Sequence, residues 1–115
     1  MKFEVKNRHT GETQFIADIE CDESESLSKK LGLAVKWAME KNVNLVGAKL
    51  CWADLSNTNL SNTDLSDTDL SWADLYKAKM FNTNLSGSDL SWANMYNVKM
   101  YNTDISEVNM YKTIM

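Results

Sequence analysis

Between Val43 and Met115, every fifth residue of the chain is large and apolar, and the phase of this pattern is never interrupted. The large residues are Leu45, Leu50, Leu55, Leu60, Leu65, Leu70, Leu75, Met80, Leu85, Leu90, Met95, Met100, Ile105, Met110 and Met115. An α-helix needs apolar residues at spacings of three and four, and a strand needs alternation, so a period of five fits neither element. It predicts a repeat architecture, in which short units stack and bury their apolar residues together.

A second period, of twenty residues, predicts how these units stack. Trp52, Trp72 and Trp92 are twenty positions apart, and so are Tyr76 and Tyr96. Because twenty residues are four units of five, residues twenty apart should lie above one another at the spacing of a parallel ladder, about 4.8 Å. Within each unit, the large residue and the small residue two positions before it would point inward, where space is tight. The other three positions would point outward.

These units resemble the pentapeptide repeat family, whose repeat is usually written A-(D/N)-L-x-x. Ala53-Asp54-Leu55, Ala73-Asp74-Leu75 and Ala93-Asn94-Met95 match that unit closely, and the resemblance covers about two thirds of the chain. The resemblance implies a mainly β fold for residues 43–115, a right-handed quadrilateral parallel β-helix of just under four coils.

The chain departs from the family pattern at two kinds of position. Threonine replaces alanine at many inward positions, and an inward hydroxyl needs a backbone partner because burying it unbonded is costly. Lys49, Lys79 and Lys99 replace Asp or Asn. That position points outward, so we expect the lysines to leave the fold intact.

Residues 1–42 are predicted to form an N-terminal cap that begins with a β-hairpin. Residues 2–7 and 13–20 largely alternate between apolar and polar side chains, and Gly11 lies in the turn between them. A hairpin and a helix in front of pentapeptide repeats also look like small repeat proteins encoded by phages and prophages. Without a cap, the first coil would expose its apolar shaft and an unpaired edge.

The second part of the cap is a helix, predicted over residues 24–41. Its start has a possible capping box formed by Asp22 and Glu25. One face is apolar and should lie across the first coil, with the hairpin beside it. That face consists of Leu27, Leu31, Ala34, Val35 and Ala38. Gly32 costs about 1 kcal/mol relative to alanine inside a helix, unless close packing requires it.

Composition argues against several classes of protein. The net charge of −4 and the scattered basic residues do not favour direct nucleic-acid binding. No signal peptide or membrane-spanning run is recognisable, so we expect a cytoplasmic protein in which Cys21 and Cys51 are reduced. The single histidine, His9, lies in the hairpin turn, and no set of ligands converges, so the sequence predicts no enzyme, cofactor or metal site.

The outward positions suggest a possible partner-binding surface. Its residues are Trp52, Trp72, Trp92, Tyr76, Tyr96, Phe81 and Tyr101. An exposed apolar strip of this kind is typical of a protein-docking site. Alternatively, these rings stack only to stabilise neighbouring coils, as cross-strand pairs do.

A possible acidic surface lies on the other faces. Its residues are Asp64, Asp67, Asp69, Asp89 and Asp104. Some pentapeptide repeat proteins are similar to B-DNA in shape and charge and bind DNA gyrase, so this side suggests a DNA mimic. The alternative is a solvated face whose Asp and Asn side chains bond to local turns.

The last coil is rich in methionine, a residue that adapts to irregular gaps and to partner surfaces. Met100, Met110 and Met115 are a possible end-to-end homodimer contact; a looser final coil is the alternative. The sequence therefore predicts a non-enzymatic, rigid protein-binding or scaffold module whose partner is unidentified. A topoisomerase-binding DNA mimic is the alternative function.

Overall fold

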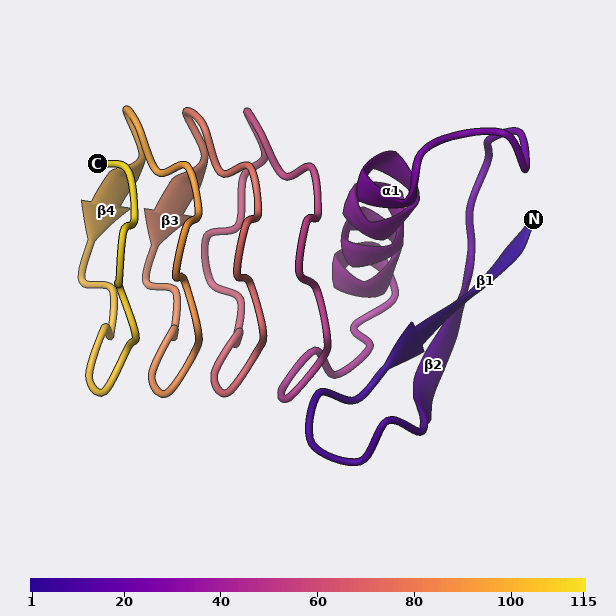
Figure 1. The fold of residues 1–115 in the computed structure, drawn as a ribbon, viewed down its shortest axis with the longest axis horizontal. Helices are drawn as coiled ribbons and strands as arrows, with labels where there is room; N and C mark the ends of the chain where they lie inside the picture. The colour runs from indigo at the N-terminus through magenta and orange to yellow at the C-terminus, as the bar shows by residue number, and fades with distance from the viewer.

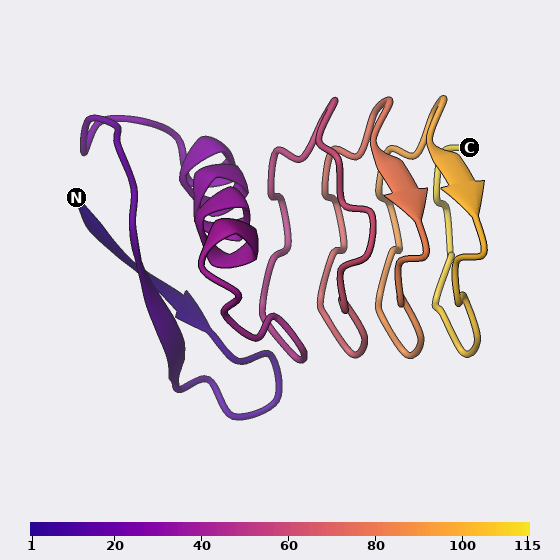
Figure 2. The same ribbon diagram turned by 180° about the vertical axis from the view of Figure 1, so that it is seen from behind.

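The computed structural model describes residues 1–115 and follows the predicted order of hairpin, helix and stacked repeats. The elements are β1 (Lys2–Lys6), β2 (Thr13–Asp18), α1 (Leu27–Glu40), β3 (Lys79–Phe81) and β4 (Lys99–Tyr101). Figure 1 shows the hairpin at one end, α1 between the hairpin and the stack, and the C-terminus at the far end, and Figure 2 shows the same order from behind.

Residues twenty apart pair with each other along the stack. β3 and β4 are parallel, with Met80 opposite Met100. Isolated bridges carry the same register through the other units and link Asp69 to Lys49 on one side and to Asp89 on the other. The backbone ladder therefore runs between coils, and the parallel stacking predicted from the period is confirmed.

Each unit turns at a residue with positive φ, two positions after the large residue. Twelve residues of the stack other than glycine adopt this conformation, with φ between 55° and 72°, and Gly47 and Gly87 take the same position in two further units. A side-chain bond accompanies most of these turns: the Asp or Asn before the large residue accepts from a backbone N–H two positions later, as Asp64 Oδ1 accepts from Ser66 N at 3.0 Å. Eleven units have this bond. Aspartate and asparagine are favoured there because their short side chains reach that N–H.

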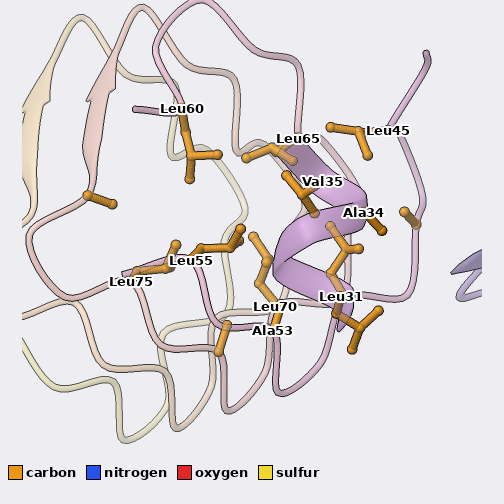
Figure 3. Close-up of a cluster of buried hydrophobic side chains, with 14 of the residues drawn as sticks. Leu31, Ala34, Val35, Leu45, Ala53, Leu55, Leu60, Leu65, Leu70 and Leu75 are labelled. Atoms are coloured by element: carbon orange, nitrogen blue, oxygen red, sulfur yellow. The ribbon is translucent and has the colours of Figure 1, made fainter. Parts of the chain in front are cut away.

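The large residues fill the inside of the stack. Every one from Leu50 to Leu90 is fully buried, and Figure 3 shows several of them pointing inward beside Leu31 and Val35 of α1. Deeply buried threonine hydroxyls find backbone partners, as expected. Thr68 donates to the Leu65 carbonyl at 2.7 Å, and other inward threonines make similar bonds.

The helix α1 closes the N-terminal end of the stack. Gly32 lies so close to the first coil that an added Cβ would stand 2.0 Å from the carbonyl oxygen of Asp54. Nearby, the backbone N–H of Asp54 donates to the Ser28 carbonyl at 2.9 Å. Close packing is therefore the reason for a glycine inside this helix.

The hairpin continues the edge of the first coil. Asn7 bridges Ala48 in an antiparallel sense, and the Lys49 N–H donates to the Lys6 carbonyl at 2.8 Å. Its strands end one and two residues earlier than predicted, at Lys6 and Asp18. Part of the edge that would otherwise be unpaired is thus covered, as a stable solenoid end requires.

The predicted start of the helix is wrong. α1 begins at Leu27, three positions after the predicted start, and its N-cap is Ser26, whose Oγ accepts from Lys29 N at 3.2 Å. Asp22 and Glu25 instead form a turn before the helix, in which Glu25 N donates to the Asp22 carbonyl at 3.1 Å. Leu27, predicted to lie on the buried face, is exposed because it is the first helical residue and precedes the contact with the stack.

Candidate functional site

Three tryptophans form a continuous column along one corner of the stack. The ring centroids of Trp52 and Trp72 lie 4.9 Å apart at 8°, and those of Trp72 and Trp92 lie 5.0 Å apart at 4°. The exposed fractions of the three residues are 51%, 45% and 42%. Because the rings cover each other's faces, the column presents mainly ring edges to solvent.

The backbone at this corner is unfavourable for tryptophan. Trp52, Trp72 and Trp92 have φ values of 72°, 62° and 63°, in a region that costs a residue with a Cβ roughly 1–2 kcal/mol. Each stacked pair contributes about 0.5–1.5 kcal/mol beyond burial. Two such pairs contribute about 1–3 kcal/mol, against a conformational cost of about 3–6 kcal/mol for three residues. Burial of about half of each tryptophan adds a further favourable term, so stacking and burial together offset this cost.

The other predicted aromatic residues lie on the adjoining faces. Tyr76 and Tyr96 stack with centroids 6.1 Å apart at 6°, and Phe81 lies opposite Tyr101 in the β3–β4 pair. Tyr101 is 74% exposed. Together with the tryptophan column these residues define the aromatic surface: Trp52, Trp72, Trp92, Tyr76, Tyr96, Phe81 and Tyr101.

One aromatic residue of this region was not predicted. Tyr111 meets Trp92 edge-on, with centroids 5.9 Å apart at 78°. Its position is nineteen residues after Trp92, whereas the strict period places Lys112 in the tryptophan column. The twenty-residue period alone therefore could not reveal this contact.

The hairpin does not cover the aromatic surface. Its Arg8 reaches the carbonyl of Thr68, with Nη1 3.2 Å from that oxygen, and that carbonyl belongs to a unit between the acidic positions Asp67 and Asp69. Arg8 thus bonds on the acidic side of the stack, and Trp52, Trp72 and Trp92 stay about half exposed.

Most of the predicted acidic residues take part in local turns. Asp69 accepts from the backbone and the hydroxyl of Ser71 at 3.1 and 2.6 Å, and Asp89 and Asp104 bond their own serines in the same way. The two bonds from Ser106, first the hydroxyl and then the backbone, lower the pKa of Asp104. These carboxylates therefore have a structural role in the corners of the coil.

The acidic columns are also short. Asp64 and Asp104 are separated by Asn84 in their bridged column. Asp67 is different from the other acids: it has a φ of 55°, and its Oδ1 would lie 2.3 Å from a Cβ added to Gly87. Asp69 and Asp89 form an adjacent pair of carboxylates in one column, and Asp54 and Asp74 form another. No column has three carboxylates in succession among these bridges, so no long acidic stripe exists.

The residues predicted for a dimer contact lie at the C-terminal end of the stack. Met100 and Met110 are half-buried against the core, and Met115 is 67% exposed. Ile105 and Ile114 are exposed at the same end. An apolar surface is thus present on the last coil of residues 1–115.

Other candidate chemistry is sparse. Cys21 and Cys51 are free thiols, and burial, followed by the negative charge of Asp69, raises the pKa of Cys51, which disfavours a reactive thiolate. No three His, Cys, Asp or Glu side chains gather in a way that could hold a metal ion. The helix α1 is too short and too polar to cross a bilayer.

Comparisons with known proteins agree with this geometry. A family model described as pentapeptide repeats matches residues 44–80 and 81–110. The chain therefore belongs to the pentapeptide repeat family, whose members are generally structural or binding proteins rather than enzymes.

Several solved structures of pentapeptide repeat proteins are similar to parts of the chain. One is HetL of the cyanobacterium Nostoc, described as involved in regulation of heterocyst differentiation (23% identity over 62% of this chain and 38% of that one, TM-score 0.40). Another is a thylakoid lumen protein of Arabidopsis thaliana (22% identity over 63% of this chain and 54% of that one, TM-score 0.25). A third is Rfr23 of Cyanothece (32% identity over 62% of this chain and 59% of that one, TM-score 0.22). The chain spans 38–59% of the length of these proteins, and no curated protein matches it.

Proposed function

We propose that this chain is a non-enzymatic, rigid protein-binding module that docks its partner through the aromatic surface. In this proposal the stack is a right-handed, four-sided β-helix of just under four coils. Its role is to hold rows of side chains at fixed spacing, which lowers the entropy cost of binding because the surface is already ordered.

The observation that carries the proposal is the tryptophan column. Three large residues occupy a left-handed corner conformation that asparagine adopts in five other units, and all three remain about half exposed. Tryptophan and tyrosine are the residues most enriched among binding hot spots. A partner that docks on the column would bury the apolar surface that the three tryptophans leave exposed.

The acidic side supports a DNA mimic less well. A mimic of duplex DNA needs closely spaced negative charges over a long surface, since DNA carries one charge per roughly 1.7 Å of its axis. Here the adjacent carboxylates are two pairs, Asp54 with Asp74 and Asp69 with Asp89, and all four accept hydrogen bonds from their own turns. These carboxylates are fully explained by the turns that they hold.

The proposal is tested by replacing Trp52, Trp72 and Trp92 together with asparagine, which suits the same corner. Wild-type and variant proteins are immobilised and exposed to an extract of the native host. We expect at least one protein to bind the wild type and to be lost from the variant, because hot-spot residues each contribute about 2 kcal/mol or more.

The matched control replaces Asp69 and Asp89 with asparagine, which preserves the turn bonds and removes two charges. Retention of the same partner by this control supports docking through the aromatic surface. If the partner is lost from the acidic control and kept by the tryptophan variant, the proposal is wrong. Inhibition of gyrase supercoiling that depends on Asp69 and Asp89 would favour the mimic instead.

We also propose that residues 1–115 associate end to end through Met100, Met110 and Met115. Light scattering at increasing protein concentration should show a dimer, because two such ends would bury each other's apolar surface. Met110→Lys should give a monomer, whereas Ile16→Lys, at an exposed position of the hairpin at the opposite end, should leave the dimer unchanged. A monomer at all concentrations would contradict this proposal.

A further inference from the structure

A groove of about 570 Å³ on the side of the stack gathers three lysines. The residues that line it are Asn57, Lys77, Lys79, Asn97, Val98 and Lys99. Residues 43–115 contain five lysines, so three of the five face this one groove. No carboxylate lines the groove. The cations that form ion pairs in this protein are the N-terminus, Lys2, Lys6 and Lys29, so Lys77, Lys79 and Lys99 form no ion pair.

Two of these lysines replace a residue that would stabilise the fold. Lys79 and Lys99 occupy the position at which eleven other units place an Asp or Asn that bonds to the backbone two residues later. An ammonium group cannot accept that bond. After Lys79, the free N–H of Phe81 is instead satisfied by the Ser61 hydroxyl at 3.1 Å.

The third lysine also stands where the backbone favours another residue. Lys77 has a φ of 58°, between Asn57 and Asn97 in the neighbouring coils, which have φ values of 57° and 59°. Asparagine tolerates this conformation better than lysine does. Lys49 and Lys112 break the same two local rules elsewhere in the stack, so the feature that sets Lys77, Lys79 and Lys99 apart is that they line one groove.

The register brings the positive charges close together. Lys79 and Lys99 are directly opposite each other in the parallel β3–β4 pair, at a backbone spacing of about 4.8 Å. Lys77 extends over the ring of Tyr76, with Nζ 5.4 Å from the centroid. Like charges opposite each other in a sheet are destabilising, and an anion bound between them would reverse this effect.

We propose that this groove is a binding site for a phosphate group, carried by a small molecule or by a phosphorylated side chain. A phosphate monoester has a charge near −2 and three strong acceptor oxygens, which three ammonium groups can satisfy together. A carboxylate has a single charge and matches the cluster less well. The lysines span two neighbouring coils, which is too short a track for the many phosphate contacts of a nucleic acid.

The asparagines suit the same ligand. Asn57 and Asn97 border the lysines in the groove, and a carboxamide offers two N–H donors. Val98 is the one apolar residue of the lining. The groove therefore favours a hydrophilic anion over an apolar ligand.

The site is tested by NMR titration of the ¹⁵N-labelled full chain at constant ionic strength. One arm uses inorganic phosphate, and a second uses a short phosphoserine peptide beside its unphosphorylated form. We expect saturable shifts of amide signals around Lys77, Lys79 and Lys99 in both arms. Tighter binding of the phosphopeptide identifies a protein segment as the source, and equal or weaker binding identifies a small molecule.

The variants Lys79→Asn and Lys99→Asn restore the residue that the repeat favours, so they should fold at least as well as the wild type. Each should weaken phosphate binding by about tenfold, the effect of one lost bond to a charged group. Lys49→Asn and Lys112→Asn remove the same charge outside the groove and should leave binding unchanged. The variant with Trp52, Trp72 and Trp92 replaced should also bind phosphate normally, because none of these residues lines the groove. A loss of phosphate binding can therefore be told apart from a loss of protein docking.

Two outcomes would overturn the inference. One is the absence of saturable shifts at phosphate concentrations of tens of millimolar, far above those at which specific sites fill. The other is equal weakening by the groove variants and the Lys49 and Lys112 controls, which would show general charge attraction instead of a site.

Discussion

Gly32→Ala is expected to lower the free energy of unfolding, although alanine is the better helix former. Helix propensity alone predicts a gain of about 1 kcal/mol. The added methyl group, however, would stand 2.0 Å from the Asp54 carbonyl oxygen, a backbone atom. Relieving that overlap requires α1 to move away from the first coil, and overpacking of this kind costs about 1–3 kcal/mol. Urea unfolding followed by circular dichroism measures the difference.

The same variant should also change one local hydrogen bond. The Asp54 N–H donates to the Ser28 carbonyl at 2.9 Å, so a displaced helix should let this amide exchange its hydrogen faster. Glu40→Ala, at an exposed position in the last turn of α1, is the control and should alter neither stability nor exchange by much. A stabilised Gly32→Ala protein with unchanged exchange at Asp54 would show that the helix does not pack on the coil as described.

Leu70→Ala should have the largest effect on stability of any single change considered for this chain. Leu70 is completely buried. Its neighbour Asp69 is bridged to Lys49 in the coil before and to Asp89 in the coil after, so Leu70 lies inside the stack with a coil on each side. Truncating a buried leucine costs about 2–5 kcal/mol, because apolar contacts are lost and a cavity remains. In a solenoid this loss should fall on the units that contact the cavity, since stability is a sum of neighbour terms.

Leu70→Met is the matched control, because methionine already fills the equivalent position at Met80 and Met95. This nearly volume-conserving change should cost less than about 1.5 kcal/mol. Urea unfolding monitored by tryptophan fluorescence reports on both variants, since Trp52, Trp72 and Trp92 lie along the stack. Equal stabilities of the alanine and methionine variants would contradict a tightly packed shaft.

The stack was predictable because its sequence signals are local and repeated. The period of five places Leu50 inside, and the period of twenty places Trp72 between its neighbours, so errors at single units average out. The inward threonines were equally predictable, because a buried hydroxyl is costly unless it bonds, and Thr68 bonds to the backbone. The inward hydroxyl of Ser88 is an exception, since it is buried without a partner.

The helix start was not predictable in the same way. Asp22 and Ser26 are both favoured N-cap residues by type, and Glu25 suits the later position of a capping box that begins at Asp22. The choice of Ser26 agrees with the docking of α1 on the first coil, where Ser28 meets Asp54. A contact between residues far apart in the sequence thus bears on a local boundary, and no local pattern contains that information.

The candidate sites were only partly predictable. The repeat period assigns each aromatic residue to its column, and the structure places those columns as expected. It assigns Lys77 and Lys79 to different faces, however, and only the shape of the corner shows that both line one groove. The edge contact of Tyr111 with Trp92 was missed for the same reason.

The twenty-residue register makes the length of this protein adjustable in whole steps. Adding or removing twenty residues would lengthen or shorten the rod while keeping each later side chain on its original face. Adding five residues would preserve the apolar interior but rotate everything after the insertion by one face. If the five residues were inserted between Trp72 and Trp92, Trp92 would no longer stack on Trp72, although the apolar interior would stay filled. Insertions and deletions in the repeats therefore preserve the interior when their length is a multiple of five residues. They preserve the surface pattern only when it is a multiple of twenty residues.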